Sequence, residues 1–187
     1  ERAALRAKWQ TAGSALHVLF VGRFYDKKGL PLIREVAAAS PRLRFTLVGS
    51  GPHDPASWGL GNVRVITYVS NEDLRELYGA HDVFLMPSFG EGWPAVVPQA
   101  MACGLPCVIS EETFQGYARD ADRFLVVPRE AARIADALRE CSEGRVNLLR
   151  QRRDLSAYAC TTWDWQRTAR QYVELFKTPA AAGANGA

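Results

Sequence analysis

The chain has 187 residues and a mass of 20.7 kDa, which is enough for one full domain and too little for two large ones. Apolar residues make up 48%, so a sizeable core is expected, and no apolar run reaches the length of a membrane-spanning helix. The net charge of +3 is mild and spread along the chain, which argues against a nucleic-acid partner.

Short apolar strands alternate with helical patterns along the chain. Strands are expected over residues 16–24, 44–48, 63–68, 83–86, 106–109 and 124–127. Helices are expected over about 29–39, over 71–80 with Ser70 as N-cap, from about 95 onward, over 129–140 and over about 145–177. The strands are continuously apolar, as in strands buried on both faces. The sequence therefore predicts an α/β fold with a doubly wound, Rossmann-like parallel sheet.

The domain organisation follows from the same pattern. We expect an N-terminal lead-in over residues 1–14, the Rossmann-like domain over 15–178, and a disordered Ala- and Gly-rich tail over 179–187. The last expected helix carries Trp163, Trp165, Tyr172 and Phe176 on one face, which is too apolar for a free helix. We expect some of these side chains to be buried against the domain and the rest to form an exposed patch.

Polar and glycine-containing loops follow four of the expected strands. These loops are Gly22-Arg23 with Lys27-Lys28-Gly29, then Gly49-Ser50-Gly51, then Tyr68-Val69-Ser70, and finally the loop around Glu91. In a doubly wound sheet, ligands bind at the carboxyl ends of the strands, near the point where the strand order reverses. The four loops share that edge, so the sequence predicts a binding site there.

Arg23 and Lys28 are five residues apart in one loop, where two cations can neutralise a diphosphate. A pair of solvated loop charges is the alternative. The segment Val48-Gly49-Ser50-Gly51-Pro52 either lines the site or is a simple turn, and it lacks the glycine patterns of ordinary dinucleotide and P-loop sites. Glu91 lies between two glycines and has no core role, and Gln99, eight residues later, can face the same crevice.

These segments together resemble the donor-site signature of the retaining glycosyltransferases of family 4, also called group 1 glycosyl transferases. The matching segments are Val21-Gly22-Arg23 with Lys28-Gly29, Val48-Gly49-Ser50-Gly51-Pro52, and Glu91-Gly92-Trp93-Pro94 with Gln99-Ala100-Met101-Ala102-Cys103-Gly104. The resemblance is close over residues 16–109 and looser around Trp163. It implies one half of a GT-B architecture, the C-terminal donor-binding domain, with the N-terminal acceptor domain missing from the chain.

The resemblance also implies roles for individual residues. Arg23 and Lys28 would bind the phosphates of a nucleotide-sugar and stabilise the leaving diphosphate, and Glu91 would hydrogen-bond the donor sugar; these three are the expected catalytic residues. The expected donor-binding residues are Gly22, Gly49, Ser50, Tyr68, Val69, Gly92, Trp93 and Gln99. No metal or cofactor is expected, because the two cations would supply the charge stabilisation that Mg²⁺ supplies elsewhere.

The implied activity is hexosyl transfer to an acceptor hydroxyl in polysaccharide or glycolipid biosynthesis, with this chain inactive alone because the acceptor domain is missing. The four cysteines form no Cys-x-x-Cys pair, which argues against zinc and favours reduced thiols in a cytoplasmic protein. Any peripheral membrane association would come through the missing half.

The chain departs from the family pattern at several positions. Pro94 stands where the family usually has Gly and removes one backbone donor, and Trp93 replaces Phe. Gln99 replaces the second Glu, which should weaken a ribose contact by about 1 kcal/mol. Residues 110–116 replace a common Gly-Gly-x-x-Glu segment. These departures leave open a non-catalytic nucleotide-sugar-binding or regulatory module, whereas a sugar-nucleotide epimerase of the same architecture fits the Glu91 region less well.

Overall fold

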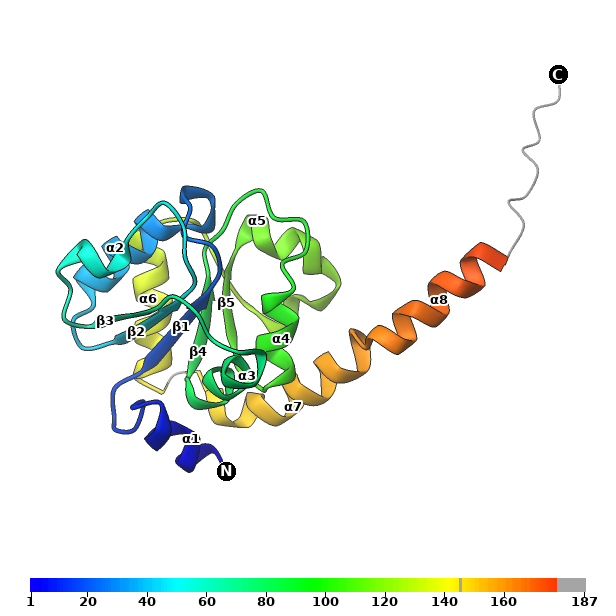
Figure 1. Ribbon diagram of the computed structural model, residues 1–187, viewed down its shortest axis with the longest axis horizontal. Coiled ribbons are helices and arrows are strands. Elements are labelled where there is room, and N and C mark those ends of the chain that lie inside the picture. The colour runs from blue at the N-terminus through cyan, green and yellow to red at the C-terminus, as the bar shows by residue number, and fades with distance from the viewer. Residues whose placement is uncertain (145, 178–187) are drawn as a thin grey trace, which may run out of the picture.

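The computed structural model describes residues 1–144 and 146–177, and within them six parallel strands form one sheet in the order β3-β2-β1-β4-β5-β6 (Figure 1). The strands are β1 (His17–Val21), β2 (Arg44–Val48), β3 (Val63–Ile66), β4 (Val83–Met86), β5 (Cys107–Ser110) and β6 (Leu125–Val127). The strand order reverses between β1 and β4. The predicted doubly wound, Rossmann-like α/β fold is confirmed.

Helices cover both faces of the sheet. They are α1 (Arg2–Lys8), α2 (Leu30–Ala39), α3 (Asn71–Ala80), α4 (Val96–Ala102), α5 (Glu111–Phe114), α6 (Ala131–Ser142), α7 (Leu148–Thr162) and α8 (Trp165–Lys177), with 3-10 turns η1 (Asp26–Lys28), η2 (Pro55–Trp58) and η3 (Gln115–Arg123). Helices α2 and α6 pack together on one face, and α3, α4 and α7 cover the other (Figure 1). This two-sided cover explains why the strands are apolar at successive positions rather than at alternate ones.

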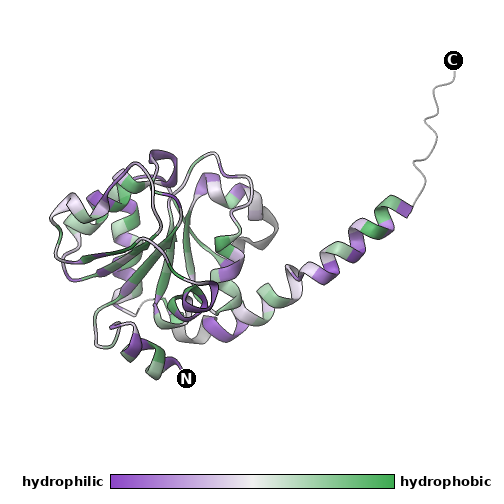
Figure 2. Cartoon of the chain, in the orientation of Figure 1, coloured by the Kyte–Doolittle hydropathy of each residue, from purple (hydrophilic) through white to green (hydrophobic). Residues whose placement is uncertain are grey.

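The core follows the two central strands. Every residue of β1 and β4 is buried, and Leu19, Phe20, Phe84 and Leu85 are fully inaccessible to solvent. Figure 2 shows the strands as the most hydrophobic part of the molecule, enclosed by helices whose outer faces are polar. The loops at the carboxyl ends of β1 and β4 are therefore anchored to fully buried strands.

The first strand is shorter than expected and ends at Val21. The chain beyond it continues alongside β2 as an irregular loop, in which Gly22 N donates to Val48 O at 3.0 Å and Phe24 N donates to Ser50 O at 2.9 Å. The loop then turns through η1 into α2. This arrangement joins the first two glycine-containing loops by backbone hydrogen bonds.

The N-terminal lead-in contains a helix that the sequence analysis did not predict. Arg2 and Arg6 of this helix, α1, both donate to Asp82 Oδ1, at 2.6 and 2.7 Å. Asp82 Oδ2 also accepts from the backbone N of His17, at 2.9 Å. The charge pairs therefore attach α1 to the start of β1 and β4, at the edge opposite the predicted site.

The single long helix expected over 145–177 is wrong, because the chain is interrupted between α7 and α8. Asp164 Oδ1 accepts from Arg167 N at 2.7 Å, which starts a new helix in the manner of an N-cap. Trp163 packs on the domain, whereas Trp165, Tyr172 and Phe176 are 76%, 57% and 82% exposed on α8, which extends away from the sheet (Figure 1). The apolar face is thus divided as expected. The expected tail over 179–187 lies outside the described residues.

Candidate functional site

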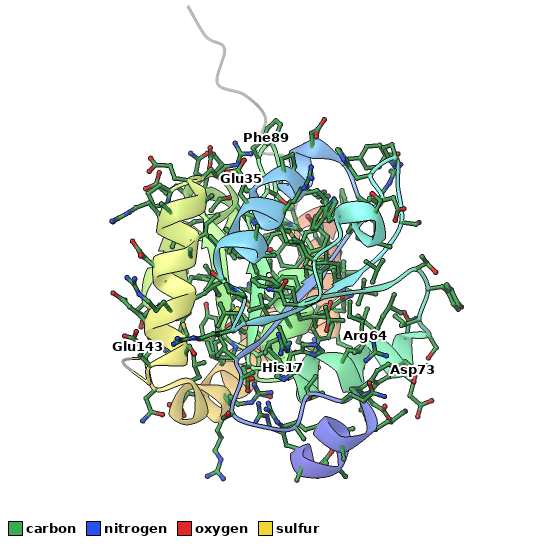
Figure 3. All side chains as sticks on the ribbon, turned by 90° about the vertical axis from the view of Figure 1, so that its left-hand side faces the viewer. His17, Glu35, Arg64, Asp73, Phe89 and Glu143 are labelled. Carbon is green, nitrogen blue, oxygen red and sulfur yellow. The ribbon has the colours of Figure 1, made fainter. Side chains whose placement is uncertain are left out.

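The candidate site lies where β1 and β4 end side by side, at the reversal of strand order. Figure 3 shows Phe89, from the loop after β4, at the opposite end of the sheet from His17, which begins β1. The loops after β1, β2 and β4 all reach this edge. A further cavity of about 460 Å³ lies at the other end of the sheet, beside Arg6 and Asp82, so it is separate from this site.

The loops contact one another backbone to backbone, which explains the glycines. A Cβ on Gly49 would lie 2.0 Å from Gly22 O, and a Cβ on Gly29 would lie 2.5 Å from Pro87 O. Both glycines also have a positive φ, of +144° and +80° respectively. Larger residues at either position would push apart the three loops that form the site.

Lys28 and Glu91 form an ion pair across two of these loops. Lys28 Nζ lies 2.8 Å from Glu91 Oε1, and the two side chains are only 16% and 14% exposed. Glu91 Oε1 is buried and makes this contact without hydrogen-bond geometry. Lys27 Nζ lies farther from the same oxygen, at 3.9 Å, and its side chain is 56% exposed. The structure therefore brings together two of the three predicted catalytic residues.

Arg23 lies in the same loop as Lys28 but makes a different contact. Its Nη2 donates to the Tyr25 hydroxyl at 2.6 Å, and its guanidinium carbon lies 4.7 Å from the centroid of the Tyr25 ring. The Arg23 side chain is otherwise exposed. It supplies a solvent-exposed positive charge at the edge of the site, whereas Lys28 supplies a shielded one.

The base of the Glu91 loop is held by several neighbouring elements. Ser88 O accepts from Ser110 Oγ at 2.5 Å and from Thr113 Oγ1 at 3.3 Å, and Phe89 N donates to Lys27 O at 2.9 Å. Ser110 also caps α5 by accepting from Thr113 N at 3.1 Å. Sequence reasoning missed this support, although a serine before Glu111 and Glu112 is a recognisable N-cap pattern.

Aromatic side chains cover the far side of the same loop. The Trp93 ring, 43% exposed, contacts the rings of Tyr117 and Trp163 at centroid distances of 5.9 and 6.2 Å. The Tyr117 hydroxyl donates to Pro94 O at 2.9 Å. Burial raises the pKa of Tyr117 well above its usual value, so this donor keeps its proton. Pro94 lacks an N–H, and its carbonyl fixes the loop instead.

Gln99 is an exposed residue on α4, which begins at Val96, close to its predicted start. Gln99 Oε1 accepts from the Tyr78 hydroxyl at 3.4 Å. Burial raises the pKa of Tyr78, so that hydroxyl also remains a donor. The Gln99 acceptor is therefore already oriented by a buried partner.

The remaining predicted residues lie along the same edge, at different depths. Gly22 is half-buried at the end of β1, Ser50 is exposed after β2, and Gly92 is exposed in the Glu91 loop. Tyr68 is 83% exposed and Val69 half-buried, both after β3, which is two strands away from β1. The structure therefore does not place either residue next to Lys28 and Glu91.

The site is open to solvent and combines a loop with several cationic residues and the shielded carboxylate of Glu91. No group of three or more His, Cys, Asp or Glu that could hold a metal occurs among residues 1–144 and 146–177. Over the same residues, no helix combines the length and apolar character needed to cross a membrane. The arrangement can accept an anion beside Lys28 and hydroxyl groups beside Glu91.

The sequence is similar to those of known glycosyltransferases. The family model described as "Glycosyl transferases group 1" matches residues 15–143. A phosphatidyl-myo-inositol mannosyltransferase of Mycobacterium leprae is 28% identical over 179 residues, which is 89% of this chain and 47% of that protein. The O-antigen chain mannosyltransferase B of Escherichia coli is 34% identical over 119 residues, covering 57% of this chain and 31% of that protein.

Solved structures share the fold at low sequence identity. Sucrose-phosphate synthase from Thermosynechococcus elongatus superposes with a TM-score of 0.81 at 24% identity, covering 94% of this chain and 48% of that one. Anabaena HepE, solved in complex with UDP and glucose, superposes with a TM-score of 0.78 at 20% identity, covering 95% and 52%. The chain thus spans about half the length of these proteins, or less in the case of the mannosyltransferase B.

Proposed function

The chain belongs to the group 1 glycosyl transferases and has the fold of a GT-B glycosyltransferase domain, and we propose that it binds the nucleotide-sugar donor of a retaining enzyme. The reaction would transfer a hexosyl group to an acceptor hydroxyl and expel a nucleoside diphosphate. The observation that carries the proposal is the shielded contact between Lys28 and Glu91 at the switch point of the sheet. It joins a cation suited to phosphate with a carboxylate suited to sugar hydroxyls.

The phosphate side of the proposal rests on the loop after β1. In the proposed complex, Lys28 binds the diphosphate as a point charge and Arg23 turns from Tyr25 to grip phosphate oxygens with its planar fork. Both charges would stabilise the leaving diphosphate as the bond to the sugar breaks. In this proposal the nucleotide lies against the backbones of Gly22, Gly49 and Ser50, beside these two charges.

The sugar side rests on the loop after β4. Glu91, flanked by Gly90 and Gly92, would accept hydrogen bonds from donor hydroxyls near the reacting carbon. Trp93 presents a partly exposed ring beside it, and Gln99 offers a carbonyl oxygen to the ribose. In this proposal Tyr68 and Val69 line the outer edge of the nucleotide pocket, and no metal or cofactor takes part.

The acceptor side of the reaction would be supplied by a second domain. The chain covers about half the length of several proteins that it matches, which leaves room in them for a second domain. Helix α8 also exposes a row of large apolar side chains. We propose that this row contacts the acceptor domain, and that the 187 residues alone bind donor without transferring sugar. Any association with a membrane would come through that other domain.

Saturation-transfer difference NMR with UDP-, GDP- and ADP-sugars tests the proposal, because it detects sugar protons held against the protein. We expect transfer to the sugar ring of at least one donor, and loss of that transfer in Glu91→Ala while the nucleobase signal remains. Absence of transfer to every nucleotide-sugar at millimolar concentration would contradict the proposal.

The second candidate is a nucleotide-sugar-binding or regulatory module without catalysis, which is favoured by Gln99 and by Pro94. Both functions predict donor binding. They differ once the acceptor domain is present, because only the enzyme then forms a glycosylated product, whose anomeric configuration would also report whether transfer is retaining. Ordinary turnover by this chain alone would show that it contains the whole active site.

A further inference from the structure

Arg129 follows β6 by two residues and reaches the loop after β4. Its Nε donates to Pro87 O at 3.2 Å, and its guanidinium carbon lies 4.5 Å from the centroid of the Phe89 ring. Strands β6 and β4 are not neighbours, because β5 lies between them. One side chain therefore crosses the end of β5 and contacts the residues on both sides of Ser88.

The contacts of Arg129 complement those made by its neighbours. Ser110 and Thr113 are buried, and both donate to the carbonyl of Ser88 in the loop after β4. Arg129 is half-buried and acts from the solvent side, where it fixes the carbonyl of Pro87 and the ring of Phe89. Together these groups set the direction in which the chain leaves the sheet.

That direction decides where Glu91 lies. Gly90 has a φ of +64°, and neither Gly90 nor Gly92 has a neighbouring atom within 4 Å of the position that a Cβ would take. The two residues that flank Glu91 therefore contribute no side-chain packing of their own. The conformation of this segment depends on the base of the loop and on the contact between Glu91 and Lys28. Beyond Gly92 it also depends on the packing of Trp93 and on the hydrogen bond from Tyr117 to Pro94 O.

We infer that Arg129 is a positioning residue that orients Glu91 toward the donor sugar through Pro87 and Phe89; the role in sugar recognition rests on the proposed function. A guanidinium can stack on a ring with its flat face while its Nε–H donates in the plane. A lysine ammonium at the same position keeps the charge but cannot make both contacts. The diphosphate is expected to depend on the other loop, which carries Arg23 and Lys28.

Hydrogen exchange of the ligand-free chain tests the positioning role. In Arg129→Ala we expect the backbone amide of Phe89, which donates to Lys27 O, to exchange about five- to tenfold faster than in the unmodified chain. Arg129→Lys should restore less than half of the lost protection. Arg133→Ala, which removes an exposed charge in the first turn of α6, is the matched control and should leave exchange of the Phe89 amide unchanged. Phe89→Leu provides a second route if Arg129→Ala folds poorly, and it should also speed exchange.

Titration calorimetry of the same variants tests the functional consequence. Arg129→Ala should weaken nucleotide-sugar binding about tenfold and change nucleoside diphosphate binding less than about twofold. Unchanged exchange of the amide of residue 89 in both Arg129→Ala and Phe89→Leu would overturn the inference, as would equal losses for the nucleotide-sugar and the diphosphate. Faster exchange in a chain that binds no nucleotide-sugar would support the positioning role and refute the proposed function.

Discussion

The Lys28 ammonium lies 2.8 Å from the Glu91 carboxylate, so the residue proposed to bind phosphate and the residue proposed to bind the sugar contact each other. Both side chains are mostly buried, which limits the screening of their attraction by water. A diphosphate that approaches Lys28 competes with Glu91 for the same charge. Donor binding should therefore release the carboxylate for sugar hydroxyls at the moment when the phosphates arrive.

We expect Lys28→Ala and Arg23→Ala each to weaken nucleoside diphosphate binding by about 1.5–3 kcal/mol, because each removes a charge-assisted contact. Binding of the free nucleoside should barely change. Lys27→Ala is the matched control, since Lys27 is adjacent in sequence but exposed and farther from Glu91. Calorimetric titrations should show large losses of diphosphate affinity for Lys28→Ala and Arg23→Ala and a small loss for Lys27→Ala. Equal losses of affinity for nucleoside and diphosphate would mean that neither Arg23 nor Lys28 touches phosphate.

Gln99→Glu should strengthen nucleotide binding by about 1 kcal/mol, because a carboxylate is a better acceptor for ribose hydroxyls than an amide oxygen. The Tyr78 hydroxyl, which keeps its proton because burial raises its pKa, would hold the new carboxylate as it holds Gln99 Oε1. A 2′-deoxy nucleotide should lose the gain. Weaker binding of the ordinary nucleotide by Gln99→Glu would show that the ribose lies elsewhere.

Gly49→Ala should lower the free energy of unfolding by at least about 2 kcal/mol, because it combines strain at positive φ with a clash between backbones. The new Cβ would lie 2.0 Å from Gly22 O, at a φ of +144°. Gly61→Ala is the control, since a Cβ there would meet nothing within 4 Å. Urea denaturation measures both, and equal effects would contradict the backbone-to-backbone contact of the two loops.

The free energy of unfolding should decrease as the pH falls, because protonation of the buried His81 is unfavourable in the folded state. His81 is fully buried, with Nδ1 2.7 Å from Leu77 O and Nε2 2.9 Å from Thr46 Oγ1, and burial lowers its pKa to about 4. A lowered pKa means that the folded state favours the neutral ring. The stabilisation is therefore complete above the unfolded pKa of about 6.5 and is lost as the pH falls toward 4, by about 3 kcal/mol in total.

Urea denaturation between pH 7.5 and 4.5 checks this expectation. The buried ring of His17 lies edge-on to His81, and Asp82 and Arg6 are the nearby charges, so their contributions remain in both proteins that are compared. His81→Gln should show a shallower loss of stability with falling pH than the unmodified chain. An equal loss of stability with falling pH in His81→Gln and the unmodified chain would show that another group is responsible.

The fold, and the convergence of the four loops on one edge of the sheet, could be predicted because they depend on local patterns. Continuous apolar strands and the loops after them define the sheet and its binding edge, and the glycine between Glu91 and Trp93 identifies the central loop. The interruption at Asp164 was missed because an aspartate within an apolar helical pattern does not by itself end a helix. The contacts of Glu91 with Lys28 and of Arg129 with Pro87 join residues far apart in the chain, and such pairs require the tertiary structure.

Thermal denaturation with a panel of UDP, GDP, ADP and their sugars tests the central claim, donor binding by this chain, most directly. A ligand at a hundred times its Kd stabilises a protein by about 2.7 kcal/mol, which corresponds to a rise in Tm of several degrees for a domain of this size. We expect one base to give this rise, and expect Arg23→Ala combined with Lys28→Ala to abolish it. No shift with any nucleoside diphosphate or nucleotide-sugar at millimolar concentration would contradict the account.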